Sequence, residues 1–277
     1  MINHEKNWKN YIDENKIDPS QLIPKKILNK SVWKNGEIDP SIREKLMEIA
    51  QDFYDHLNDE VEEIPELEDV IFTGSLASYN YHDLSDIDLH LLLDFSKFKK
   101  NPELLEKYFT AKRVNWNRVH DIMIGGHEVE IYVQDSNEEH LADGIYSLLK
   151  DEWDKKPKRE EVSIDFDAAK KKFRNISNEI EELQNLFDKG EHRKVYDHSI
   201  KLKEKIAKMR RSGLAEGGIF SSENIAFKML RMSLDLEKLS NLKNSSYDKM
   251  MSTSRDSDTK INISETWKKF INKGDQK

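Results

Sequence analysis

The fold of this chain is decided by the stretch VIFTGSLASYNYHDLSDIDLHLLL, residues 70–93. Its first four residues are apolar or β-branched and run directly into Gly74-Ser75, a pattern that predicts a short buried strand ending in a glycine turn. Ten residues later, Asp86 opens a second apolar run that continues to Leu93. The stretch therefore predicts two neighbouring strands joined by a polar loop.

The second strand is expected to present two carboxylates together. Alternate side chains of a strand share a face, so Asp86 and Asp88 should point the same way while Ile87 and Leu89 face the core. Along the chain they would lie roughly 6.6 to 6.8 Å apart. Like charges at that spacing are unfavourable unless a cation lies between them. Mg²⁺ suits such a pair, because it needs only one or two carboxylates plus substrate phosphates.

Two further features could complete a site around these acids. The glycine of Gly74-Ser75 lets a phosphate approach the backbone, and the serine hydroxyl can donate to it. A hairpin around Gly125-Gly126-His127 is predicted to carry Glu130 between apolar neighbours that face the other way. A third carboxylate there would complete a two-metal site. Glu128 and Tyr132 alternate with Glu130, so an ordinary half-solvated hairpin is the alternative interpretation.

Other elements place this stretch within an α+β domain. Helical spacing and capping residues predict helices that begin at Pro40 and at Pro102, the second ending near Val114. Ser136 and Glu139 form a capping box that predicts a helix through Leu149. The result is a mixed sheet flanked by helices. His120 and His127 are expected at the surface.

A helical region is expected to follow the basic segment 155–159. The apolar spacing predicts a helix over 173–187 that stops at Gly190, a second over 195–209 that stops near Gly213, and a third from Ser221-Ser222. Residues 243–262 are polar and are expected to be mobile, with Trp267 and Phe270 on a short final helix. The expected divisions are an N-terminal extension 1–38, a catalytic domain 39–160, a C-terminal helical domain 161–242 and a tail 243–277.

Composition excludes several classes of protein. The 277 residues contain no cysteine, which excludes zinc ribbons, iron–sulfur clusters and thiol catalysis. There is no apolar leader and no apolar run of membrane-spanning length, so we expect a cytoplasmic protein without a membrane partner. The net charge of −8 would repel a nucleic-acid backbone overall.

One basic segment could still meet phosphate. Residues 201–211 carry six basic side chains against one acidic side chain. Lys208, Arg210 and Arg211 lie at its end, next to a glycine-containing loop expected at 213–218. These three are candidates for nucleotide binding. The alternative is a solvated helix surface.

Taken together, the residues of 70–133 resemble the signature of the DNA polymerase beta-like nucleotidyltransferase superfamily. The resemblance implies that Gly74 and Ser75 hold a triphosphate and that Asp86 and Asp88 bind two Mg²⁺ or Mn²⁺ ions. Glu130, in place of the commoner aspartate, would be the third metal-binding acid and would help to activate the acceptor hydroxyl. More loosely, segments 23–28 and 223–228 resemble those of predicted nucleotidyltransferases of large tailed bacteriophages.

The resemblance implies an enzyme that moves a nucleoside monophosphate from an NTP such as ATP to a hydroxyl acceptor and releases pyrophosphate. The acceptor could be RNA, another nucleotide, a protein side chain or a small molecule. Within the same superfamily the alternatives are pyrophosphoryl transfer and the synthesis of linear or cyclic oligonucleotides. From a different class, the alternative is a catalytically inactive antitoxin-like or scaffold protein.

Overall fold

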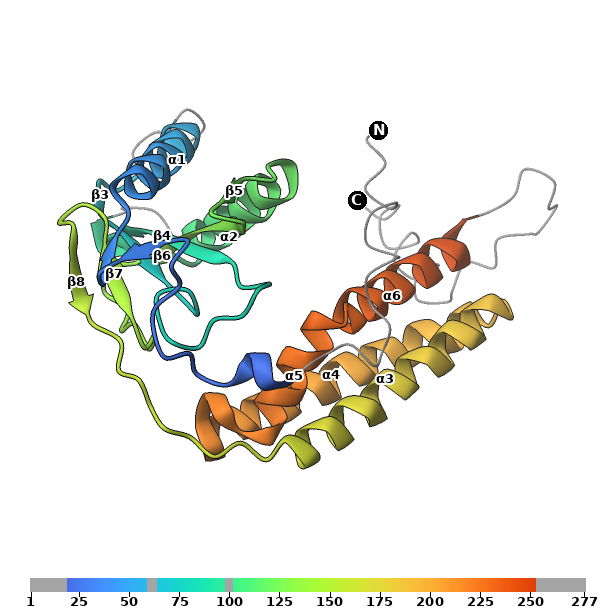
Figure 1. Ribbon diagram of the computed structural model, residues 1–277. Helices are drawn as coiled ribbons and strands as arrows, with labels where there is room; N and C mark the ends of the chain where they lie inside the picture. Colours follow the sequence, from blue (N-terminus) through green and yellow to red (C-terminus); the bar gives the residue numbers. More distant parts are fainter. Residues whose placement is uncertain (1–18, 59–63, 98–101, 253–277) are drawn as a thin grey trace, which may run out of the picture. The chain divides into compact units, whose positions relative to one another are not determined.

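A computed structural model describes residues 19–58, 64–97 and 102–252 (Figure 1). The described residues form two compact units. Of these residues, the first unit contains those up to Arg174 together with Met209–Ser233, and the second contains Asn175–Lys208 together with those from Leu234 to Ser252. Each unit is therefore built from two separate segments of sequence.

The first unit is organised around a six-stranded mixed sheet with the order β5-β6-β4-β3-β7-β8. Strand β4 pairs with β6 in parallel, and every other neighbouring pair is antiparallel. The strands are β3 Leu67–Thr73, β4 Ile87–Leu93, β5 Met123–Ile124, β6 His127–Asp135, β7 Ile145–Ser147 and β8 Glu152–Lys155. With helices α1 Pro40–Asn58 and α2 Pro102–Val119, this confirms the expected α+β class.

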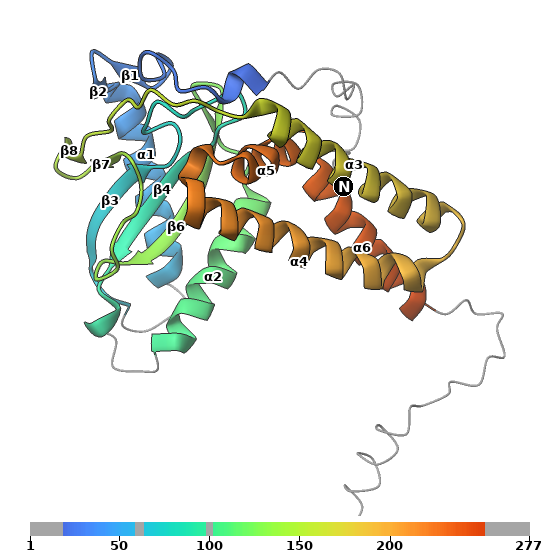
Figure 2. The same cartoon turned by 90° about the horizontal axis from the view of Figure 1, so that it is seen from below.

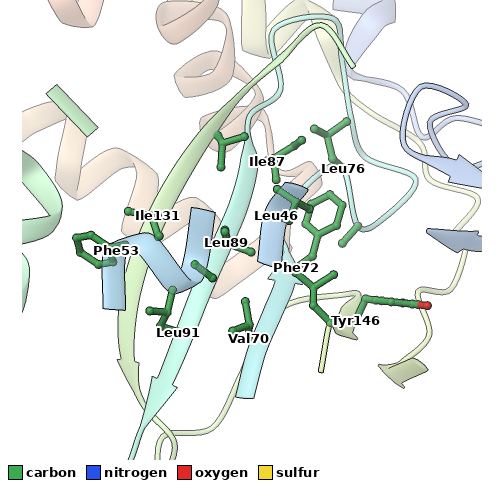
Figure 3. Packing of buried hydrophobic residues seen from close by; sticks show 14 of the residues in the cluster. Leu46, Phe53, Val70, Phe72, Leu76, Ile87, Leu89, Leu91, Ile131 and Tyr146 are labelled. Carbon is green, nitrogen blue, oxygen red and sulfur yellow. The ribbon is translucent and has the colours of Figure 1, made fainter. Parts of the chain in front are cut away.

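The core forms on one face of this sheet because the apolar residues of β4 alternate. Ile87, Leu89, Leu91 and Leu93 are all fully buried, whereas the residues between them are partly exposed. Helix α1 covers this face with an apolar stripe at helical spacing, made of Leu46, Ala50, Phe53 and Leu57. Figure 3 shows Leu46 and Phe53 of this stripe among the buried residues of the sheet.

Helix α2 closes the exposed edge of β6. It extends to Val119, five residues beyond the expected end near Val114. The Asn117 side chain accepts from the Ile131 amide at 3.1 Å and donates to the Ile131 carbonyl at 3.2 Å. A single amide thus satisfies the two backbone groups that β5 is too short to reach.

The predicted helix over residues 136–149 is wrong. This segment instead forms β7, which pairs Ser147 with Ile71 and Tyr146 with Phe72 of β3, and continues into β8. The capping box is overridden because β3 offers a free strand edge on which Ile145, Tyr146 and Leu148 become buried. Gly144 permits the approach, since a Cβ there would lie 1.9 Å from the Ala77 carbonyl oxygen.

The second unit consists of helices. It contains residues 175–188 of helix α3, Phe166–Asp188, and residues 192–208 of helix α4, His192–Gly217. The two helices are joined through Gly190, which has φ +78°, and Figure 2 shows them one after the other along the chain. Lys205 of α4 pairs with Glu179 of α3 at 2.5 Å, as the expected antiparallel hairpin requires. Helix α6, Asp235–Met251, completes the unit.

Two expectations about the helical region are corrected. Helix α4 does not stop at Gly213 but continues to Gly217, so residues 213–217 are not a loop. Gly213 is buried, and a Cβ there would lie 2.4 Å from Cβ of Glu223 in α5, Ser222–Met232. The segment from residue 243, expected to be mobile, is helical to Met251, because Leu242 and Ser246 of α6 are buried.

Other expectations remain predictions. The short helix around Trp267 and Phe270 lies outside the described residues. The domain limits 39–160 and 161–242 concern independent folding and stay predictions. Within the described ranges, no helix is both long and apolar enough to cross a membrane.

Residues before α1 brace the loop that follows β3. Strands β1 Trp33–Lys34 and β2 Glu37–Ile38 form a small sheet, preceded by the 3-10 helix η3 Pro19–Leu22. The Trp33 indole N–H donates to the Leu76 carbonyl at 2.7 Å, and its ring stacks on Phe72 and Trp153. The Lys25 amide donates to the Tyr79 carbonyl at 2.6 Å. The N-terminal segment therefore fixes the loop from outside.

We expect Trp33→Phe to lower the free energy of unfolding by about 1 to 3 kcal/mol, since the buried Leu76 carbonyl loses its partner. Urea denaturation followed by circular dichroism measures this. Trp116→Phe is the matched control. The Trp116 ring packs edge-on against Phe53, so this substitution tests the effect of ring size alone. Equal denaturation midpoints for wild type and Trp33→Phe would contradict the bracing role.

Candidate functional site

Strands β4 and β6 bring the three predicted acids onto one face of the sheet. Asp86 immediately precedes β4, and Asp88 lies two residues further along, on the face opposite the buried leucines. In the parallel pairing of β4 with β6, Asp88 stands directly opposite Glu130. The structure thus places Asp86, Asp88 and Glu130 as the alternation of the sequence predicts.

The Gly74 turn lies against this group. Gly74 has φ +78°, a conformation that glycine adopts without strain. A Cβ at this position would lie 1.8 Å from Oδ2 of Asp88 and 2.7 Å from its Cγ. Any side chain here would displace the carboxylate, so the turn requires glycine on two independent grounds.

The loop after Gly74 is held by its own serines. The Ser75 hydroxyl donates to the Ser85 hydroxyl at 2.8 Å, and Ser85 in turn accepts from the His82 amide at 2.9 Å. The Ser78 hydroxyl donates to the Ser75 carbonyl at 3.0 Å. Ser75 is therefore fixed to Ser85, the residue that precedes Asp86.

His127 is not a surface residue, contrary to the expectation. It is buried at the start of β6, where Nδ1 lies 2.7 Å from the Ser85 carbonyl and Nε2 lies 3.0 Å from Nδ2 of Asn29. These partners imply that Nδ1 donates and that Nε2 accepts. The ring thereby joins the N-terminal segment to the loop that precedes β4. His120 is exposed, as expected.

Two side chains that sequence reasoning missed already contact the acids. Arg231 of α5 forms an ion pair with Oδ2 of Asp86, and the Tyr132 hydroxyl donates to Glu130. Tyr132 could have been found, because it lies two residues after Glu130 on the same face of β6. Arg231 could not, since nothing in the sequence connects α5 with a strand 145 residues away.

The site holds more negative charge than its surroundings neutralise. Burial raises the pKa of Asp88 to about 7, and the charges of Glu130 and Asp86 add to the effect. Burial also raises the pKa of Asp86, although Arg231 opposes the change. The pKa of Glu128 on the same strand as Glu130 is raised by burial and by Asp86. An added cation would stabilise the charged forms of these carboxylates.

The donor chemistry fits a hard divalent cation. In the described ranges, no three His, Cys, Asp or Glu side chains are arranged as they stand to hold a metal ion. Mg²⁺ and Mn²⁺ prefer oxygen ligands, and Mg²⁺ commonly takes one or two carboxylates together with substrate phosphates. Asp86 and Asp88 supply that number. Glu130 is adjacent, with its carboxylate hydrogen-bonded to Tyr132.

The three basic candidates are divided between the two units. Arg210 belongs to the first unit, and its guanidinium lies over the Phe227 ring at 4.2 Å. Arg211 is exposed in the same unit, whereas Lys208 is exposed in the second unit. Arg210 is thus the one of the three with a described contact to α5.

Comparisons with known proteins add little. No family profile and no curated protein matches the chain. Among solved structures it is similar to the STING-associated cyclic di-GMP synthase CdnE from Capnocytophaga granulosa, with 15% identity and a TM-score of 0.21. The match covers 76% of this chain and 84% of that chain. At this TM-score the two chains have no demonstrated common fold, so function must be inferred from the site.

We expect Asp88→Asn to stabilise the metal-free protein at pH 8, by about 1 to 3 kcal/mol after allowance for solvent screening. The pKa of Asp88 in the folded state, about 7, lies above that in the unfolded chain. The wild type therefore loses stability as pH rises from about 4 through 7, and the asparagine variant does not. Thermal unfolding at pH 4 and pH 8 measures the difference.

Asp94→Asn is the matched control, and its expected change in stability has the opposite sign. Hydrogen bonds from Ser96 and Asn137 lower the pKa of Asp94 to about 2, so its charge stabilises the folded state above the pH at which the unfolded carboxyl ionises. The variant should be less stable than wild type at pH 8. An Asp88→Asn variant that is also less stable at pH 8 would contradict the charge argument.

Proposed function

We propose that this protein is a Mg²⁺-dependent nucleotidyltransferase, which transfers a nucleoside monophosphate from an NTP to a hydroxyl acceptor and releases pyrophosphate. The observation that carries the proposal is the contact of the Gly74 turn with Asp88, which stands in register with Glu130. A glycine turn offers backbone amides to a phosphate, and the carboxylates beside it are suited to a metal ion, so this arrangement supports the proposal.

In the proposed reaction, the acceptor oxygen attacks the α-phosphorus, and the bond from that phosphorus to the β-bridging oxygen breaks. Bound divalent cations would lower the pKa of the attacking hydroxyl and neutralise phosphate charge. Asp86 and Asp88 would hold them, while the turn amides and the Ser75 hydroxyl position the triphosphate. Glu130 would take the acceptor proton, with its carboxylate oriented by Tyr132. The protein's contribution is positioning and charge, as is usual in phosphoryl chemistry.

A second candidate has one observation in its favour. Asp86 and Glu130 are both bonded to groups of the protein itself. An inactive scaffold of the antitoxin-like class would retain the Arg231–Asp86 ion pair permanently, whereas the proposed enzyme must release Asp86 to bind metal. Synthesis of linear or cyclic oligonucleotides uses the same attack at the α-phosphorus with another nucleotide as the acceptor, and an RNA acceptor changes only the attacking hydroxyl. In pyrophosphoryl transfer the acceptor attacks the β-phosphorus instead, and the NMP leaves.

Incubation with each of four α-labelled NTPs and Mg²⁺, with and without cellular RNA and protein, should label a product in one or more reactions. Identification of that product separates the alternatives. Asp86→Asn should reduce the rate by about 10³-fold or more, because the charge that holds the metal is lost. Asp83→Asn, in the exposed part of the same loop, is the control and should keep the rate. Full activity in Asp86→Asn would refute the assigned site.

We expect Ser75→Ala to lower kcat/KM by a factor that corresponds to about 1 to 3 kcal/mol of lost transition-state stabilisation, if its hydroxyl meets a charged phosphate oxygen. Ser85→Ala is the matched control, since it removes the same serine–serine hydrogen bond from the other side. A phosphate-binding Ser75 predicts a larger loss in Ser75→Ala than in Ser85→Ala. Equal losses would show that the hydroxyl only shapes the loop.

A further inference from the structure

Helix α5 presents cations to the candidate site. Lys228 and Arg231 are three residues apart and lie on one side of the helix. Arg231 pairs with Oδ2 of Asp86, and Arg210 lies over Phe227 of the same helix. All of these residues belong to the first unit, together with the sheet.

The cations of this cluster repel one another. Burial lowers the pKa of Lys228, and the charges of Arg210 and Arg231 lower it further against the opposing effect of Asp143. Burial and Arg231 likewise lower the pKa of Arg210. Among the described residues, none forms an ion pair with Lys228. The cluster thus has capacity for a polyvalent anion even while Asp86 holds Arg231.

The pair of Arg231 with Asp86 is placed to exchange partners. The Arg231 side chain is 61% exposed, whereas that of Asp86 is 18% exposed. Exposed ion pairs contribute little stability and re-form readily. A guanidinium and a metal ion cannot both occupy the same carboxylate oxygen of Asp86. Arg231 is therefore a competitor of a cation that binds Oδ2 of Asp86, and its positive charge also opposes a cation at the other oxygen.

We propose that Arg231 is a positioning residue with two exclusive partners, the Asp86 carboxylate in the free protein and the triphosphate of the NTP in the complex. Arrival of the triphosphate would draw Arg231 away and release Asp86 for metal, so that substrate and metal bind in a coupled manner. Lys228 and Arg210 would contribute positive charge to the same phosphate site. This inference rests on the proposed function.

The test measures two ligands separately on the full-length chain: Mn²⁺ alone, by electron paramagnetic resonance of the free ion, and inorganic tripolyphosphate, by calorimetry. In Arg231→Gln we expect Mn²⁺ to bind about three- to tenfold more tightly, because Asp86 is no longer occupied. Tripolyphosphate should bind about tenfold more weakly, because a charge-assisted donor is lost. Opposite changes in the two affinities are the signature of exchange.

Two controls separate exchange from a general change in charge. Lys228→Gln removes the same charge from the same helix without an Asp86 partner, and should change Mn²⁺ affinity by about twofold at most. In an Asp86→Asn background, Arg231→Gln should no longer tighten Mn²⁺ binding. Circular dichroism checks that each variant is folded.

The outcomes distinguish this inference from the function on which it rests. If the wild type binds both probes but Arg231→Gln changes both affinities in one direction or neither, the exchange is refuted and the proposed function stands. If the gain in Mn²⁺ affinity persists in the Asp86→Asn background, the exchange is also refuted. If the folded wild type binds neither Mn²⁺ nor tripolyphosphate, the proposed function fails and the exchange with it.

Discussion

The candidate site depends on the close approach of the Gly74 backbone to the Asp88 carboxylate. That approach needs β3 and β4 in their observed register, with Thr73 opposite Asp88. It also needs a core that holds β4 by its alternate leucines, and a loop fixed from outside by Trp33 and His127. Core, loop and N-terminal segment thus all determine the position of one carboxylate relative to one turn.

The sequence predicts the centre of this arrangement well because local rules apply there. Alternation along β4 places Asp86 and Asp88 on one face, and the hairpin glycines Gly125 and Gly126 both have positive φ, as their turn requires. The helix predicted from the capping box at Ser136 was wrong, because pairing with the free edge of β3 contributes more stability than a local cap. The predicted end of the helix near Gly213 was wrong, because a glycine can allow close packing of two helices as well as a turn.

What the sequence could not show is set by contacts between distant segments. Trp33, His127 and Arg231 each bond to the loop or strand of the site from elements far away in the chain. None of them belongs to a local sequence pattern, since tryptophan, histidine and arginine side chains also occur on ordinary protein surfaces and in protein interiors. The acids of a site can be read from spacing, whereas the groups that restrain those acids require the tertiary structure.

The edge of β6 shows how the sheet ends. An open strand edge is a template onto which another extended chain can add, which leads to aggregation. Here the Asn117 amide bonds to the amide and carbonyl of Ile131, so the edge is closed at its middle by one side chain. The acid-bearing face of β6 can therefore stay accessible to a substrate while the adjoining edge is protected from unwanted strand addition between copies of the protein.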